Sequence, residues 1–171
     1  VLMAQGKVVR APDLGLNATF AKVSANSGNL ALVSQSGAMC SAVLDWAKAN
    51  QVGFSSVISL GVTTDVDFGE ILDYLIYDSR THYILMYVEG IRNARRFMSA
   101  LRSAARIKPI ILLKAGRHEA GSQAALAHSG MTAVSDTVFD AAVRRAGVVR
   151  VQNVGQLFYA AKALASKFRP Q

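Results

Sequence analysis

The amino-acid sequence predicts an α/β domain in which a parallel sheet is covered by helices on both faces. Five short apolar runs alternate along the chain with stretches whose apolar residues recur at helical spacing. The apolar runs are nearly continuous rather than alternating, which is typical of strands buried on both faces. Alternation of strands and helices in this way produces parallel strands joined by helical crossovers.

The expected strands are the apolar runs, at residues 30–33, 57–60, 83–88, 109–113 and 148–151. The expected helices follow the strands, with apolar stripes within residues 39–47, 68–76, 94–105, 138–146 and 154–164. Candidate N-caps are Ser135 or Asp136 for one helix, Asn153 for another, and any of Thr63, Thr64, Asp65 and Asp67 for a third. Gly147 suits the position just after a helix. Five strands favour the flavodoxin-like order 2-1-3-4-5 over the Rossmann order 3-2-1-4-5, because five is the smaller set. The prediction is a three-layer α/β/α fold.

One domain accounts for the length of the chain, because 171 residues can bury a core of ordinary size. Residues 28–171 are assigned to that domain. Residues 1–27 show little periodicity and are assigned to a lead-in or linker. The chain begins at Val1 rather than at a methionine, which favours a fragment of a larger protein.

Composition narrows the class of protein further. Apolar residues make up 51% of the chain and charged residues 18%, which indicates a globular domain. No apolar run approaches the roughly 20 residues that cross a bilayer, so no membrane partner is expected. The single cysteine, Cys40, excludes an internal disulfide framework and favours the cytoplasm. One cysteine and three scattered histidines give no metal-ligand spacing, so no metal site is expected.

The formal net charge of +8 raises the question of a nucleic-acid partner. The basic residues, however, lie mostly between apolar helix positions and are not interleaved with aromatic residues. Solvated helix faces explain them better, and some of the charge could instead meet an acidic neighbouring domain or anionic ligands such as nucleotides and CoA. No nucleic-acid partner is predicted.

Three loops should converge at the edge of the sheet where the first, third and fourth strands end. The first, Ser34-Gln35-Ser36-Gly37, opens a helix whose free N–H groups could bind phosphate or carboxylate, although helix capping alone would also explain it. The second is Glu89-Gly90. A shielded carboxylate there would need a partner such as an imidazole N–H, whereas an exposed loop glutamate would need none.

The third loop, residues 114–130, contains His128 within Ala127-His128-Ser129-Gly130. A neutral imidazole just before a predicted helix could be a nucleophile toward phosphorus, a proton carrier, a metal ligand or a solvent-facing side chain without a role. His82 and His118 are assigned to the solvent-facing class. A catalytic serine is disfavoured, because no histidine and aspartate are placed to form a triad.

Several motifs, in the same order along the chain, resemble the second domain of the nucleoside-diphosphate-forming acyl-CoA synthetases. This family includes the succinyl-CoA synthetase α subunit and the ADP-forming acetyl-CoA synthetases. The motifs span residues 29–164 and read N-L-A-L-V-S-Q-S-G-A, D-V-D-F-G-E-I-L-D-Y-L, Y-V-E-G, K-P-I-I-L-L-K-A-G-R, A-H-S-G and F-D-A-A-V-R-R-A-G-V-V-R-V. The sequence is also similar, and more closely, to the synthetase-like half of Pat-type bacterial protein lysine acetyltransferases, in which an acetyltransferase domain is attached.

The resemblance implies roles for the residues of the three loops. The family's histidine takes a phosphoryl group from an acyl phosphate and passes it to a nucleoside diphosphate, and the matching residue is His128. The glutamate that hydrogen-bonds this histidine matches Glu89. The Ser-x-Ser-Gly turn, whose helix points at the phosphohistidine, matches residues 34–37. The predicted phosphate-binding residues are therefore Ser34, Gln35, Ser36, Gly37, Ser129 and Gly130.

Two departures from the family pattern accompany these matches. The usual Ser-His-Thr-Gly stands here as Ala127-His128-Ser129-Gly130, which keeps the hydroxyl after the histidine. The family's asparagine after the glycine of the second strand is Val62, which removes a polar group from that loop.

The implied reaction converts acyl-CoA, phosphate and ADP to acid, CoA and ATP. The resemblance implies CoA or acyl-CoA, ATP or ADP, and Mg in the parent protein, with no cofactor bound tightly by this domain. The implied partners are a CoA-binding domain, an ATP-grasp domain and, from the Pat-type resemblance, an acetyltransferase domain. The domain alone is not expected to turn over. The alternative is a non-catalytic acyl-CoA-sensing module that regulates an attached acetyltransferase, whereas a flavin-binding flavodoxin is disfavoured because the phosphate loop lacks a threonine-rich run.

Overall fold

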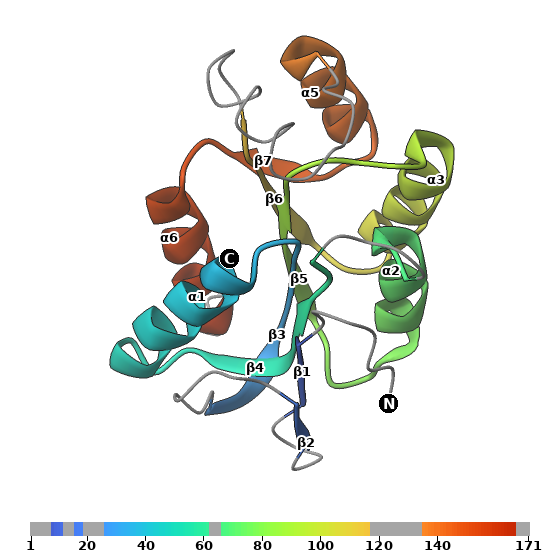
Figure 1. Ribbon diagram of the computed structural model, residues 1–171. Coiled ribbons are helices and arrows are strands. Elements are labelled where there is room, and N and C mark those ends of the chain that lie inside the picture. Colours follow the sequence, from blue (N-terminus) through green and yellow to red (C-terminus); the bar gives the residue numbers. More distant parts are fainter. Residues whose placement is uncertain (1–7, 12–15, 19–25, 62–65, 117–134, 167–171) are drawn as a thin grey trace, which may run out of the picture.

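The computed structural model describes residues 8–11, 16–18, 26–61, 66–116 and 135–166. In these residues one seven-stranded sheet lies between two layers of helices (Figure 1). The strands are β1 (Val8–Ala11), β2 (Leu16–Ala18), β3 (Asn26–Ser34), β4 (Gly53–Ser59), β5 (Tyr83–Val88), β6 (Ile110–Lys114) and β7 (Val149–Val151). The helices are α1 (Gly37–Ala49), α2 (Phe68–Tyr77), α3 (Ala94–Ala105), α5 (Asp136–Arg145) and α6 (Val154–Ala165).

The strand order in the sheet is β2-β1-β4-β3-β5-β6-β7. The five strands from β4 to β7 pair in parallel, and their order by position in the chain is 2-1-3-4-5. The predicted flavodoxin-like topology is thereby confirmed. Each of the predicted strands and helices is present, with boundaries shifted by a few residues.

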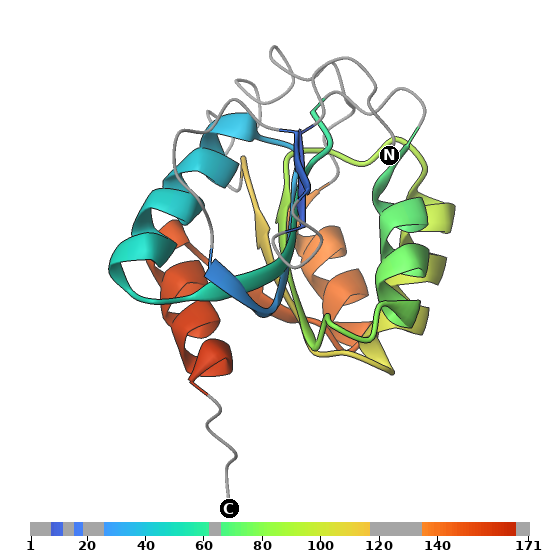
Figure 2. The ribbon, with the colours of Figure 1, turned by 90° about the horizontal axis from the view of Figure 1, so that it is seen from below.

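The helices form two separate layers (Figure 2). Helices α1 and α6 cover one face of the sheet, while α2, α3 and α5 cover the other. Along β3, Leu30 and Leu32 pack toward α1 and α6, whereas Ala31 and Val33 pack on the opposite side. This double burial explains why the strand reads as one continuous apolar run. In the part of the chain that the structure describes, no helix has both the length and the apolar character needed to cross a bilayer.

The segment expected to be a lead-in, residues 1–27, differs from that expectation. It contributes β1 and β2, and β3 already begins at Asn26. Strand β1 pairs antiparallel with β4, with Val9 opposite Ile58, and β2 continues the sheet beyond β1. The two strands have four and three residues, too few to produce a periodic pattern. They are defined by hydrogen bonding of β1 to β4, which is distant in the sequence, and of β2 to β1.

Local signals at the helix ends agree with the prediction at Asp67, Gly147 and Asn153, and the Asn153 side chain caps α6 by accepting from the Gln156 N–H (2.9 Å). Asp67 and Glu70 form a capping box, in which Asp67 Oδ1 accepts from the Gly69 N–H (2.7 Å) and Glu70 Oε2 from the Asp67 N–H (2.9 Å). Gly147 follows α5 with a φ of 80°, the left-handed conformation that glycine adopts readily. Ser135 occupies the N-cap position of α5 without a side-chain hydrogen bond.

The C-terminal end of α2 is in contact with a buried ammonium group. Lys108 is only 8% exposed, and its Nζ donates to the backbone oxygens of Leu75 and Asp78. These carbonyls lie at the C-terminal end of α2, where helical partners are missing and the dipole favours a cation. The side chain of Lys108 therefore caps the C-terminal end of α2.

We expect Lys108→Met to lower the free energy of unfolding by about 1–3 kcal/mol, because the buried Leu75 carbonyl and the partly buried Asp78 carbonyl lose their charged donor. Urea denaturation measures the change. Lys162→Met is the matched control, since Lys162 is exposed and its ammonium reaches, within the described part of the chain, only Asn50 Oδ1, at 3.4 Å. The control should change the free energy of unfolding by no more than about 0.5 kcal/mol. Equal effects of the two substitutions would contradict this role for Lys108.

Candidate functional site

Three strands of the sheet end side by side, and the predicted functional loops follow them. The Gln35 N–H donates to the Tyr87 carbonyl (3.1 Å), and the Ala115 N–H donates to the Val88 carbonyl (2.8 Å). The ends of β3, β5 and β6 are thus adjacent. The chain leaves β3 toward β4 on one side, while β5 lies on the other, so this is the topological switch point of the sheet. Open α/β folds bind their ligands in this crevice.

The turn after β3 is shaped by its two serine hydroxyls. Ser34 is fully buried, and its Oγ donates to the Ser36 carbonyl (2.9 Å) and accepts from the Ser36 N–H (3.0 Å). Ser36 is the N-cap of α1, and its Oγ accepts from the Met39 N–H (3.2 Å). Both hydroxyls therefore hold the turn and cap the helix. Any phosphate affinity of this turn comes mainly from backbone N–H groups.

The N-terminus of α1 is well suited to an anion. Gly37 and Ala38 are exposed, and their N–H groups have no hydrogen-bond partner among the described residues. The first turn contains no acidic residue, so the positive end of the helix dipole is not neutralised from within the helix. An anion at this position would meet free N–H donors and a favourable dipole.

Gln35 connects this turn to the one after β5. The residue is only 6% exposed, and its Oε1 accepts from the N–H groups of Glu89 (2.6 Å) and Gly90 (3.0 Å). Its Nε2 donates to the Gly90 carbonyl (2.9 Å). The amide thus holds the Glu89-Gly90 turn against the start of α1. Sequence reasoning gave Gln35 a contact with phosphate, which stays a prediction, and missed this bridging function.

Glu89 has a half-buried side chain at the end of β5. Among the described residues its carboxylate has neither a hydrogen bond nor an ion pair, although its backbone is held by Gln35. Burial, and after it the charge of Glu89, raise the pKa of the neighbouring Tyr87 phenol. The backbone of Glu89 is therefore fixed by Gln35, and its carboxylate has no partner among the described residues.

The other predicted site residues, His128, Ser129 and Gly130, lie outside the described residues, as do His118 and Val62. Their contacts with Glu89 and with α1 stay predictions. The described residue before this segment, Gly116, has a φ of 67°. His82 is exposed at the start of β5, as expected for a histidine without a role in the site.

A small pocket adjoins the Glu89-Gly90 turn on the side of α2 and α3. It is lined by Gln35, Asp67, Phe68, Gly90, Ile91, Arg92, Asn93 and Phe97. Asp67 and Asn93 both use their side chains to cap the helices that follow them. In the described parts of the chain, no group of three or more His, Cys, Asp or Glu residues is placed to hold a metal ion.

Comparison with known protein families identifies the family to which this chain belongs. Residues 27–164 match the family described as the succinyl-CoA ligase like flavodoxin domain. The chain belongs to this family. The resemblance inferred from the sequence motifs is thereby confirmed for the synthetase domain.

Two curated relatives of this succinyl-CoA ligase-like domain are similar over most of its length. It is 43% identical over 146 residues to acetate–CoA ligase [ADP-forming] I of Archaeoglobus fulgidus, covering 85% of this chain and 21% of that protein. It is 42% identical over 156 residues to the acetate–CoA ligase [ADP-forming] I subunit alpha of Pyrococcus furiosus, covering 91% of this chain and 34% of that subunit. The domain thus spans about a third or less of these relatives.

A solved structure of similar sequence supports the same assignment. The dinucleotide forming acetyl-coenzyme A synthetase 1 of Ca. Korarchaeum cryptofilum, in complex with phosphate and ADP, superposes with a TM-score of 0.88 at 34% identity. The match covers 95% of this succinyl-CoA ligase-like domain and 36% of the synthetase chain.

We expect Gln35→Leu to lower the free energy of unfolding by roughly 1–3 kcal/mol, because the N–H groups of Glu89 and Gly90 lose their acceptor. Chemical denaturation measures this loss. Gln156→Leu is the matched control, since the side chain of the exposed Gln156 makes, among the described residues, a single hydrogen bond, which it accepts from the Gln152 N–H (2.7 Å). The control should remain within about 0.5 kcal/mol of the wild type. A loss of similar size in the control would count against the bridging function of Gln35.

Cys40, in the first turn of α1, lies next to Ser34 of the turn after β3, and its thiol should be unreactive in the folded protein. Its side chain is buried, and burial raises the pKa of the thiol to about 11 despite hydrogen bonds with Ser34 and Ser59. Because only the thiolate reacts, we expect labelling by a disulfide reagent at pH 8 to be at least ~100-fold slower in the folded than in the unfolded protein. The labelling rate should rise as the pH approaches 11. Rapid labelling of the native protein at pH 8 would show that this turn opens readily.

Proposed function

We propose that this domain carries the phosphoryl group in an NDP-forming acyl-CoA synthetase, with His128 as the carrier. The observation behind the proposal is the Glu89 carboxylate, which Gln35 holds by its backbone and which has no partner among the described residues. An imidazole N–H is the kind of donor that such a carboxylate accepts. The N–H groups of Gly37 and Ala38, which have no partner among the described residues, follow β3, the strand next to β5. They are suited to bind the phosphoryl oxygens.

In the proposed reaction the free imidazole nitrogen of His128 attacks the phosphorus of an acyl phosphate. The phosphorus–nitrogen bond forms as the bond between phosphorus and the acyl oxygen breaks, and the acid leaves as its carboxylate. The other ring nitrogen keeps its proton and donates it in a hydrogen bond to Glu89, which stabilises the positive charge on the ring. A nucleoside diphosphate oxygen then attacks the same phosphorus and releases the imidazole.

The backbone N–H groups at the start of α1 would stabilise the charge on the transferred phosphoryl oxygens in both steps. Donors fixed in place before the reaction need no reorganisation as that charge develops. Ser34 and Ser36 contribute indirectly, because their hydroxyls fix the turn that presents these donors.

The relatives support the wider assignment. Those described above are named as CoA ligases or synthetases, and one of them is described in complex with phosphate and ADP. We therefore propose that CoA-binding and ATP-grasp domains, in the same or a partner chain, complete the reaction, which uses acyl-CoA, phosphate, ADP and Mg and releases acid, CoA and ATP. We favour this synthetase context over an attached acetyltransferase domain. A cytoplasmic location is part of the proposal, because Cys40 is a free thiol.

Phosphorylation of the full-length protein tests the proposal. We expect incubation with acetyl phosphate, or with ATP and the ATP-grasp partner, to add one phosphoryl group that intact-mass analysis detects at neutral pH and that acid removes. His128→Ala should abolish the adduct, and Glu89→Gln should slow its formation by about 10- to 100-fold. His82→Ala is the matched control, because His82 is exposed outside the site, and it should leave the rate unchanged.

An adduct that survives in His128→Ala would overturn the role of His128. Absence of any adduct on the wild type, with a partner that phosphorylates an established synthetase α subunit, would overturn phosphoryl transfer altogether. The acyl-CoA-sensing module would then be the remaining candidate function.

A further inference from the structure

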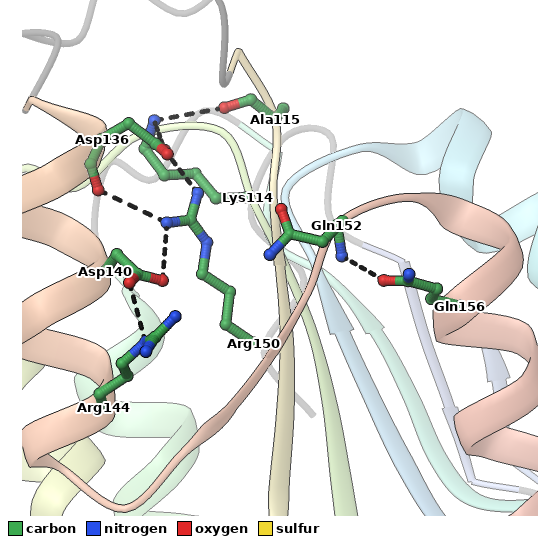
Figure 3. A network of polar contacts seen from close by, with 8 residues as sticks. All are labelled: Lys114, Ala115, Asp136, Asp140, Arg144, Arg150, Gln152 and Gln156. Carbon is green, nitrogen blue, oxygen red and sulfur yellow. Dashed lines mark hydrogen bonds and ion pairs between the residues drawn. The ribbon is translucent and has the colours of Figure 1, made fainter.

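A cluster of charged side chains lies between the sheet and α5. It consists of Lys114, Asp136, Asp140 and Arg150, and we call it the α5 charge cluster (Figure 3). Arg150 comes from β7, and its side chain is only 5% exposed. Its guanidinium pairs with Asp136 and, at 3.2 Å, with Asp140 Oδ1. A buried guanidinium with two carboxylates is energetically acceptable only while both pairs are intact.

Lys114 joins this cluster from the last position of β6. Its side chain is 10% exposed, and its Nζ lies 3.8 Å from Asp136 Oδ1. The Lys114 ammonium and the Arg150 guanidinium lie 5.6 and 5.4 Å from the centre of the Phe139 ring. Burial lowers the pKa of Lys114, the charge of Asp136 opposes this, and the charge of Arg150 adds to it. The negative charge of Asp136 therefore offsets the repulsion between the Lys114 ammonium and the Arg150 guanidinium.

The chain positions of these residues give the cluster a functional meaning. Lys114 is the last residue of β6, and Asp136 is the first residue of α5. The connection between them contains His128. The ion pair between Lys114 and Asp136 thus joins the two ends of that connection, and Arg150 ties the same carboxylate to β7. Simple attachment of α5 to the sheet does not need these charges, because Phe139 and Val143 already pack into the core.

We propose that Asp136 is a positioning residue for His128. By binding Lys114 and Arg150 together, it fixes the separation of the two ends of the connection that carries the histidine. This inference rests on the proposed function of His128. A nucleophile must be held close to its attack geometry, and a displacement of about 1 Å can cost a factor of ~100 in rate. The proposal assigns Asp136 no contact with the substrate or the phosphoryl group, so its effect should appear only through His128.

Asp140 provides a matched control for Asp136. It lies one turn further along α5 and pairs with Arg150, at 3.2 Å, and with Arg144, at 2.8 Å. Among the described residues, however, it has no contact with Lys114. Substitution of either aspartate by asparagine therefore weakens the binding of α5 to β7. Only the change at Asp136 breaks the link between the two ends of the connection.

The experiment compares Asp136→Asn, Asp136→Glu and Asp140→Asn in the full-length protein. For each variant, the rate of phosphorylation by saturating acetyl phosphate, the half-saturating concentration and the melting temperature are measured. We expect Asp136→Asn to lower the saturated rate about tenfold with the half-saturating concentration unchanged. Asp140→Asn should lower the saturated rate less than twofold, although its melting temperature should be similar to that of Asp136→Asn. Asp136→Glu, which keeps the charge, should recover most of the rate.

Equal losses of rate in both asparagine variants, following their melting temperatures, would overturn the positioning role while leaving phosphoryl transfer intact. A change in the half-saturating concentration alone would also overturn it, because positioning of the nucleophile acts on the chemical step. If the wild type takes up no phosphoryl group, the proposed function fails, and the positioning role of Asp136 falls with it.

Discussion

Burial of the central strands on both faces is the constraint from which the rest of this structure follows. The side chains of β3, β5 and β6 point alternately into two apolar clusters, one on each side of the sheet. A polar group within these strands would be desolvated without a partner. Polar groups are therefore concentrated where the strands end, beside the helix starts that follow them. This is why the groups proposed for phosphoryl transfer, although far apart in the sequence, belong to neighbouring strand ends.

The Gln35 amide makes two of these strand ends into one rigid unit. The start of α1 favours negative charge, whereas Glu89 on the adjacent turn favours positive charge. A phosphorylated imidazole has both, with anionic oxygens on phosphorus and an N–H on the far side of the ring. Because a neutral amide fixes the relation of the two turns, it adds no charge of its own to either environment. A carboxylate or an ammonium at position 35 would disturb that balance.

Most of the architecture could be predicted from the sequence, because it depends on patterns that repeat locally. Apolar runs marked the five parallel strands, and residues such as Asp67 and Gly147 marked helix ends. Contacts between distant segments leave no such pattern. The antiparallel strands β1 and β2, the hydrogen bonds of Gln35 and the burial of Arg150 all depend on such contacts. Basic residues in general suggested solvated faces, so nothing local distinguished Lys108 or Arg150 from an exposed cation.

The same limit applies to the site. The Ser34–Gly37 turn and Glu89 could be placed at one sheet edge from topology alone, since the strand order was predictable. The separate functions of the side chains within this turn could not be predicted, because they depend on which hydrogen-bond partners the fold brings close to each of them. There the serine hydroxyls and the Gln35 amide hold the turn, and the first N–H groups of α1 have no partner among the described residues.

The pairing of β1 with β4 also bears on how the chain behaves when it is not fully folded. Strand β4 is seven residues long and almost entirely buried, and without β1 the backbone groups along one of its sides would form a long unpaired edge. Such an edge is a template for pairing with other chains. The short β1–β2 hairpin covers it, while the opposite edge, β7, has only three residues. Loss of β1 and β2 would therefore expose the edge of β4, and we expect a truncation that begins at β3 to aggregate.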